Sequence, residues 1–104
     1  MIGPRLAPAE AYAKAPSIIS EIGWTARRAV QALRGATADR EYWLRKAALL
    51  DRIAWNDERA HIVGDAIEAA ELAAHRLTDL DGAQGVSDPR GYVRSEYARW
   101  ASQH

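Results

Sequence analysis

The chain has 104 residues, no cysteine, and 14 acidic side chains that balance 14 basic ones, so its formal net charge is zero. The lack of cysteine excludes disulfide bonds, thiolate metal sites and cysteine nucleophiles. No apolar run approaches the roughly 20 residues that a membrane span needs. The amino terminus also lacks the apolar core of a signal peptide, so we expect a cytoplasmic protein with no membrane partner.

The charge is divided unevenly along the chain. Residues 1–52 carry nine basic and five acidic side chains, whereas residues 53–104 carry five basic and nine acidic ones. The two halves therefore have net charges of +4 and −4. Each half can attract the opposite charge on a partner or on a second copy of the chain.

Residues 1–16 predict an irregular amino-terminal arm, because they hold three of the four prolines. The arm leaves room for one or two helical turns. Residues 17–104 predict a single helical domain, since a chain of this length makes one domain. Much of its apolar content is alanine, which predicts a thin core, and oligomerisation is a natural remedy for such a core.

Ser17 is expected to cap a helix that ends near Gly35. Gly23 interrupts the helix, and a kinked helix with exposed arginines is one interpretation of the segment. Apolar residues recur through it at helical spacing: Ile18, Ile19, Ile22, Ala26, Ala29, Val30 and Leu33.

The same segment also resembles the helix-turn-helix pattern of DNA-binding proteins. In this alternative Gly23 makes the turn and Thr25 caps a second, recognition helix. The resemblance covers about 17 residues and departs from the pattern at Ala29, where Val or Ile is usual. Arginine is the commonest reader of guanine. The candidates for DNA contact are then Thr25, Arg27, Arg28 and Arg34.

Thr37 is the expected cap of the next helix, which reaches about residue 55 and has an apolar arc wide enough for several neighbours. Asn56 or Asp57 is expected to break the chain before another long helix. Residues 38–55 and 57–80 would then form an antiparallel hairpin. Without the break they would merge into one very long helix that only dimerisation could bury.

Small and apolar residues predict a buried stripe on the helix of residues 57–80. The stripe consists of Ile62, Ala66, Ala69, Ala70, Ala73, Leu77 and Leu80. A last helix begins at Asp88 and Pro89, with the aspartate as its cap. Alanines allow close approach of a partner helix, and tryptophans near the ends of a fold often lie in interfaces. The interface candidates are Trp24, Ala66, Ala70, Ala73 and Trp100.

One helix face could carry metal ligands: His61, Asp65, Glu68 and His75. Its ends would lie about 21 Å apart at 1.5 Å per residue, which is too far for one ion. We therefore interpret it as an exposed helix face and expect no metal. The sequence also lacks a catalytic constellation and a glycine-rich phosphate loop, so we expect no enzyme, cofactor or small-molecule substrate.

These patterns predict an all-α fold: a small bundle of three to four helices with a long antiparallel hairpin and an irregular amino-terminal arm. The leading hypothesis for function is a non-enzymatic, homodimeric interaction or regulatory module that recognises a protein partner through helix faces. The alternative is a small helix-turn-helix-like transcription regulator that uses residues 17–34 on DNA.

Overall fold

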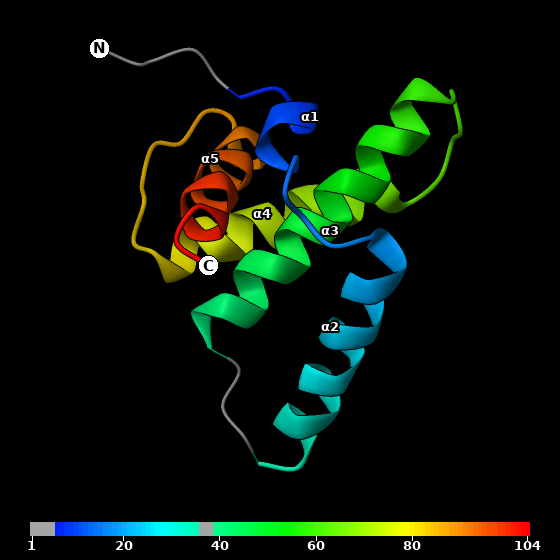
Figure 1. The fold of residues 1–104 in the computed structure, drawn as a ribbon. Helices are drawn as coiled ribbons and strands as arrows, with labels where there is room; N and C mark the ends of the chain where they lie inside the picture. Colours follow the sequence, from blue (N-terminus) through cyan, green and yellow to red (C-terminus); the bar gives the residue numbers. More distant parts are fainter. Residues whose placement is uncertain (1–5, 36–38) are drawn as a thin grey trace.

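The computed structural model describes residues 6–35 and 39–104, and within these ranges the protein is helical without strands (Figure 1). The predicted all-α class is therefore confirmed. One short and four longer helices are present in the described residues. They are α1 (Pro8–Ala11), α2 (Ile18–Leu33), α3 (Arg40–Arg59), α4 (Ala66–Leu80) and α5 (Pro89–Ala101).

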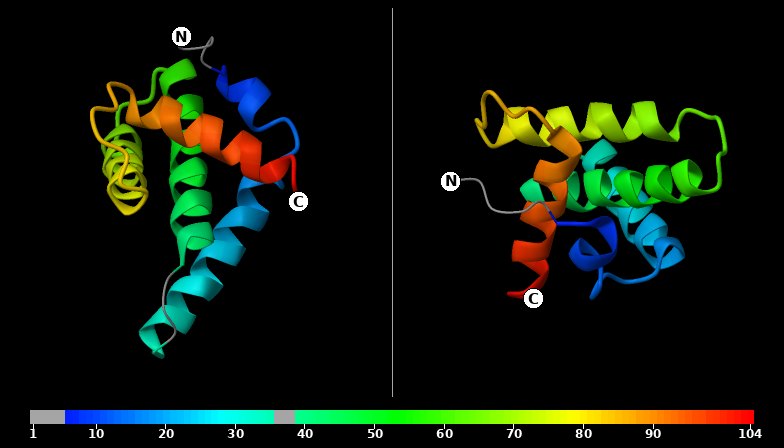
Figure 2. Two further views of the ribbon diagram at one scale, coloured as in Figure 1. Left: turned by 90° about the vertical axis from the view of Figure 1, so that its left-hand side faces the viewer. Right: turned by 90° about the horizontal axis from the view of Figure 1, so that it is seen from above.

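The longest helix, α3, lies at the centre and contacts α2, α4 and α5, while α1 packs on α5. The chain turns back after α3, so that α4 lies beside it, and α5 crosses the pair (Figure 2). The core draws residues from α1, α3, α4 and α5. Its buried apolar residues are Ala11, Tyr12, Leu44, Ala47, Ala48, Ala73, Ala74, Leu77, Val93 and Tyr97.

The predicted caps of α2 and α5 are confirmed by their side-chain hydrogen bonds. The Ser17 Oγ accepts a hydrogen bond of 3.1 Å from the backbone N–H of Ser20. At the start of α5 the Asp88 Oδ1 accepts one of 3.1 Å from the N–H of Gly91. A Cβ at Gly91 would collide with this Asp88 carboxylate, which would then have to shift. Such caps contribute about 1 kcal/mol each.

The start of α3 differs from the expectation. Thr37, the predicted cap, lies outside the described residues. The helix begins at Arg40, and the Oδ1 of Asp39 accepts a 3.0 Å hydrogen bond from the N–H of Tyr42. Aspartate caps at least as well as threonine, so the observed cap is Asp39.

The predicted break at Asn56 or Asp57 is wrong. Helix α3 continues to Arg59, and α4 begins only at Ala66, so the expected helix of residues 57–80 is also wrong. Asn and Asp cost well under 1 kcal/mol inside a helix. At this point the side chain of Asn56 also accepts a 3.1 Å hydrogen bond from Arg59 Nη2.

The chain leaves α3 at His61, whose φ of 57° is left-handed. Its neighbour Ile62 donates a 2.9 Å hydrogen bond back to the carbonyl of Asp57, which closes the helix end as in a Schellman motif. Gly82 has the same role after α4, with a φ of 67°. Histidine adopts this conformation more readily than most residues but less readily than glycine. A histidine is therefore a weaker sequence signal for a helix end than a glycine.

The predicted stripe on α4 is only partly buried. Ala70, Ala73 and Leu77 are buried, and Ala74, which was not expected, is buried as well. Ile62 and Leu80 are about half exposed. Because α3 extends past the expected break, Ile62 lies in the turn between the helices instead of on α4.

Candidate functional site

The helix-turn-helix interpretation of residues 17–34 is wrong in its geometry. Residues 18–33 form one continuous helix, α2, and Gly23 lies inside it without a positive φ. The Oγ1 of Thr25 is buried within this helix and has no hydrogen-bond partner, so Thr25 caps nothing. A mid-helix glycine costs only about 1 kcal/mol, which packing of α2 on α3 can outweigh.

The arginines proposed for DNA contact are spread over this single helix and its end. Arg28 forms a 2.8 Å ion pair with Asp39, and Arg27 and Arg34 are exposed. No separate recognition helix therefore presents them together.

Two of the alanines proposed as an interface are used inside the chain. Ala70 and Ala73 are buried where α4 packs on α3, and Ala66 is half-buried. Ala70 therefore has no surface left for a partner in this fold, and Ala73 has little.

The two terminal tryptophans are half-buried and lie near one cation. The Arg45 guanidinium lies 3.6 Å from the ring centroid of Trp24 and 5.4 Å from that of Trp100. The Trp100 ring also stacks on His104 with centroids 4.7 Å apart. Both indole rings therefore contact other residues of the same chain.

The metal-ligand spacing noted on the acidic helix is not realised. His61 and Asp65 precede α4, so they do not share its face with Glu68 and His75. Within the described residues, no group of three or more His, Asp or Glu side chains is placed to hold a metal ion.

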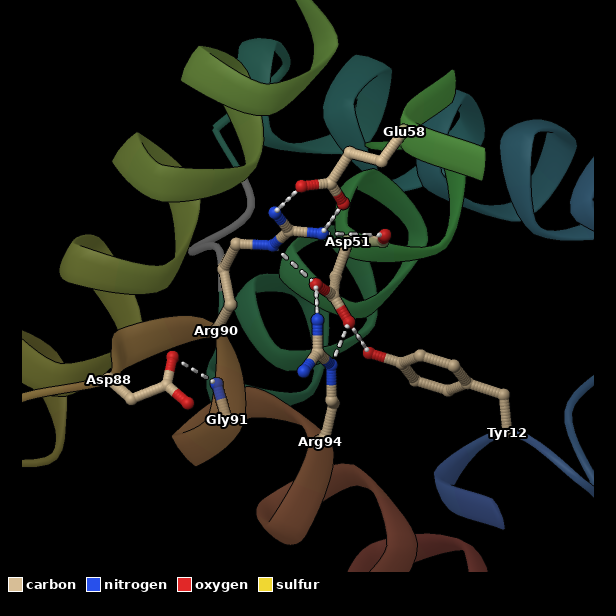
Figure 3. A network of polar contacts seen from close by, with 7 residues as sticks. All are labelled: Tyr12, Asp51, Glu58, Asp88, Arg90, Gly91 and Arg94. Carbon is tan, nitrogen blue, oxygen red and sulfur yellow. Dashed lines mark hydrogen bonds and ion pairs between the residues drawn. The ribbon is translucent and has the colours of Figure 1, made fainter. Parts of the chain in front are cut away.

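A buried polar network centres on Asp51 of α3 (Figure 3). Its carboxylate accepts a 2.6 Å hydrogen bond from Arg90 Nε and a bidentate pair of 2.8 and 3.0 Å from Arg94. The hydroxyl of Tyr12 donates to it at 2.6 Å. The network therefore joins α3 and α5 to the residue that follows α1.

Charge in this network is balanced by a second carboxylate. Arg90 also forms a 3.0 Å ion pair with Glu58, which follows Asp51 by seven residues on α3. Burial, and then the neighbouring Asp51, raise the pKa of Tyr12 well above its usual range, so its hydroxyl stays a donor. Since each carboxylate oxygen of Asp51 already accepts two hydrogen bonds, we assign the network to folding, not to proton transfer.

This network was not predicted from the sequence, although the spacing of its residues holds a signal for it. Asp51 follows Leu44 by seven residues and Ala48 by three, so a helix places all three on one face. A carboxylate on a buried face needs cationic partners. Arg90 and Arg94, four residues apart on the last helix, are such a pair.

A second network joins the start of α3 to the end of α4 and to α5. Arg40 binds Asp81 in a bidentate ion pair of 2.7 and 2.8 Å, and Tyr92 donates to Asp81 at 2.7 Å. The Arg40 guanidinium lowers the pKa of the Asp81 carboxyl below its ordinary 3.8. Burial and then Asp81 itself raise the pKa of Tyr92 to about 12.

Because the pKa of Asp81 is lowered in the folded state, the free energy of unfolding depends on pH in the acidic range. Its charged form is favoured in the folded state, so its contribution is complete above the unfolded pKa of about 4 and is lost as pH falls through the lower folded pKa. We expect the free energies of unfolding of wild type and Asp81→Asn to differ at pH 6 and to converge toward pH 2. Urea titrations across this range measure both, and a pH-independent difference would contradict the assignment.

Helix α2 is attached to α3 through a third polar cluster. Arg45 binds the buried Glu21 at 2.7 Å and Glu41 at 2.9 Å, while its guanidinium covers Trp24. This cluster fixes the face of α2 that looks toward α3, and so decides which face looks outward.

The outward face of α2 is apolar. Ile19 is 83% exposed, Ile22 48%, Val30 45% and Leu33 88%. With the exposed Ala26 between them, these residues recur at spacings of three and four and lie on one side of the helix. We refer to these five residues as the α2 face.

A second apolar surface lies between α3 and α4. It is a groove of about 460 Å³ lined by Trp43, Lys46, Leu50, Ala69, Leu72, Ala73 and Arg76. We call it the α3–α4 groove. It uses different residues and different helices from the α2 face.

Comparison of the chain with protein-family models, curated proteins and solved structures finds no match. Among the described residues, no helix has both the length and the apolar character that crossing a membrane requires. The assignment of function therefore depends on the surfaces described above.

Proposed function

We propose that this small helical bundle, with α3 and α4 as an antiparallel hairpin, is a non-enzymatic interaction module that forms a homodimer through the α2 face. The observation that carries the proposal is the exposure of Ile19 and Leu33, which are 83% and 88% accessible at the two ends of that face. Large apolar side chains clustered in this way mark interaction sites in soluble proteins.

The pattern of the α2 face suits pairing with itself. Ile19 and Leu33 each lie seven residues from Ala26, so the face is symmetric about that alanine. An antiparallel pair of α2 helices would place Ile19 of one copy beside Leu33 of the other, as a two-fold interface requires. The small Ala26 at the centre allows the helices to approach closely.

The exposed apolar surface is sufficient for a weak dimer. The four large side chains of the α2 face together expose roughly the equivalent of two and a half complete side chains. Burying them on both copies would contribute about 8–16 kcal/mol at about 1.5–3 kcal/mol for each complete side chain. Association costs about 4–15 kcal/mol, which is of similar size, so we expect a weak dimer whose population depends on concentration.

Sedimentation equilibrium of wild type and of the double variant Ile19→Ser, Leu33→Ser tests this proposal. We expect a concentration-dependent mass that approaches a dimer for wild type, and a monomer for the double variant at the same concentration. Because both residues are exposed, circular dichroism should show unchanged helicity.

The matched control is Val63→Ser, which alters a 99% exposed apolar residue in the turn between α3 and α4. It should leave the mass of the dimer unchanged. A wild-type monomer at several hundred micromolar, or a double variant that still dimerises, would refute pairing through the α2 face.

A further inference from the structure

The α3–α4 groove is shaped to receive apolar side chains. Ala69 and Ala73 are small residues on its α4 side, and Trp43, Leu50 and Leu72 add larger apolar side chains. Leu72 is 66% exposed, so the groove retains uncovered apolar surface within this chain. Its lining spans residues 43–50 and 69–76, which corresponds to about 10 Å or two helical turns.

Two cations lie over the aromatic residue of the groove. The Nζ of Lys46 is 5.3 Å from the ring centroid of Trp43, and the Arg76 guanidinium is 5.0 Å from it. Among the ion pairs of the described residues, none includes Lys46 or Arg76, although most of the other arginines in α3 and α5 bind carboxylates. Two like charges over one ring favour an anionic group beside them.

We propose that the α3–α4 groove binds an amphipathic helix of a partner protein whose apolar row is flanked by acidic side chains. Two apolar side chains three or four residues apart would fit a groove two turns long, as in other helix-in-groove complexes. Carboxylates beside this row would pair with Lys46 and Arg76. The proposal goes beyond dimerisation, because it adds a second binding surface on α3 and α4.

The charges argue against the α2 helix of a second copy as the occupant. Exposed Arg27 and Arg34 lie on α2 and at its end, and they would bring positive charge toward Lys46 and Arg76. Like charges placed together across an interface oppose binding.

Two synthetic helical peptides of 18 residues serve as probes. They share one row of leucines and differ only in the flanking positions, which are glutamate in one peptide and lysine in the other. We expect the glutamate peptide to bind the wild-type protein at least tenfold more tightly by calorimetry, with affinity that falls as salt is raised. Equal affinity of the two peptides would overturn the proposal.

Variants then locate the binding site. Lys46→Glu combined with Arg76→Glu should reverse the preference between the peptides. Leu72→Ser should lower the affinity for the glutamate peptide about tenfold. All three residues are partly or fully accessible, and circular dichroism of each variant verifies the fold. A charge-reversed variant that keeps the wild-type preference would overturn the proposal.

The double variant Ile19→Ser, Leu33→Ser separates this proposal from that of the dimer. It should bind the glutamate peptide as wild type does, whether or not it dimerises. If it loses the peptide, the probe binds the α2 face and the groove proposal fails. Displacement of the peptide by duplex DNA at low salt would likewise overturn it in favour of a nucleic-acid surface.

Discussion

Replacing Asp51 with alanine is expected to lower the free energy of unfolding by about 3–5 kcal/mol, which is the usual effect of breaking a buried ion pair. The substitution leaves the buried Arg90 and the largely buried Arg94 without the carboxylate that both bind. It also removes the acceptor of the Tyr12 hydroxyl. Urea denaturation followed by far-ultraviolet circular dichroism measures the change.

The matched control for Asp51→Ala is Arg99→Ala, which breaks a surface ion pair of 3.4 Å to Glu96. Exposed pairs contribute at most about 1 kcal/mol, so this variant should unfold close to wild type. If Asp51→Ala is as stable as Arg99→Ala, the network of Figure 3 does not hold α3 and α5 together.

Replacing Arg45 with alanine is expected to loosen α2 and to cost about 2–4 kcal/mol. Glu21 would remain buried without its cationic partner, and Trp24 would lose the guanidinium that covers it. Amide hydrogen exchange should accelerate first within residues 18–33, since the other helices keep their own contacts. The same variant should weaken the proposed dimer, because it releases the helix that carries the α2 face.

Glu41→Gln is the control for the Arg45 prediction, since it removes only the half-exposed partner of this arginine. It should cost about 0.5 kcal/mol, as is usual for an exposed pair four residues apart on a helix. Uniform acceleration of exchange over all helices in Arg45→Ala would show that Arg45 supports the whole fold and not the attachment of α2.

The sequence correctly predicted those helix ends that are set by interactions between neighbouring residues. Ser17 and Asp88 are short polar residues before apolar or proline-led helices, and both cap as expected. The end of α2 before Gly35 follows the same rule, since its φ of 101° suits glycine. At His61 the same left-handed geometry occurs without glycine, so the end of α3 was predicted too early.

The candidate surfaces depended on information that no local pattern contains. The apolar residues of α2 share one side of the helix, and only its packing against Arg45 shows that Ile19 and Leu33 on this side look outward. Ala70, which was predicted to meet a partner, is instead fully buried within the chain. A helical pattern identifies which residues share a face, but it does not identify what covers that face.

By itself, then, the sequence determined that the chain is helical, where several helices begin, and that charge is separated between its two halves. Only the tertiary structure decided which charges meet. Asp51 binds Arg90 and Arg94 across separations of 39 and 43 residues, and Arg40 binds Asp81 across 41. The physical reason is that hydrogen bonds within a helix depend on neighbours in the chain, whereas burial and ion pairing depend on how the helices pack.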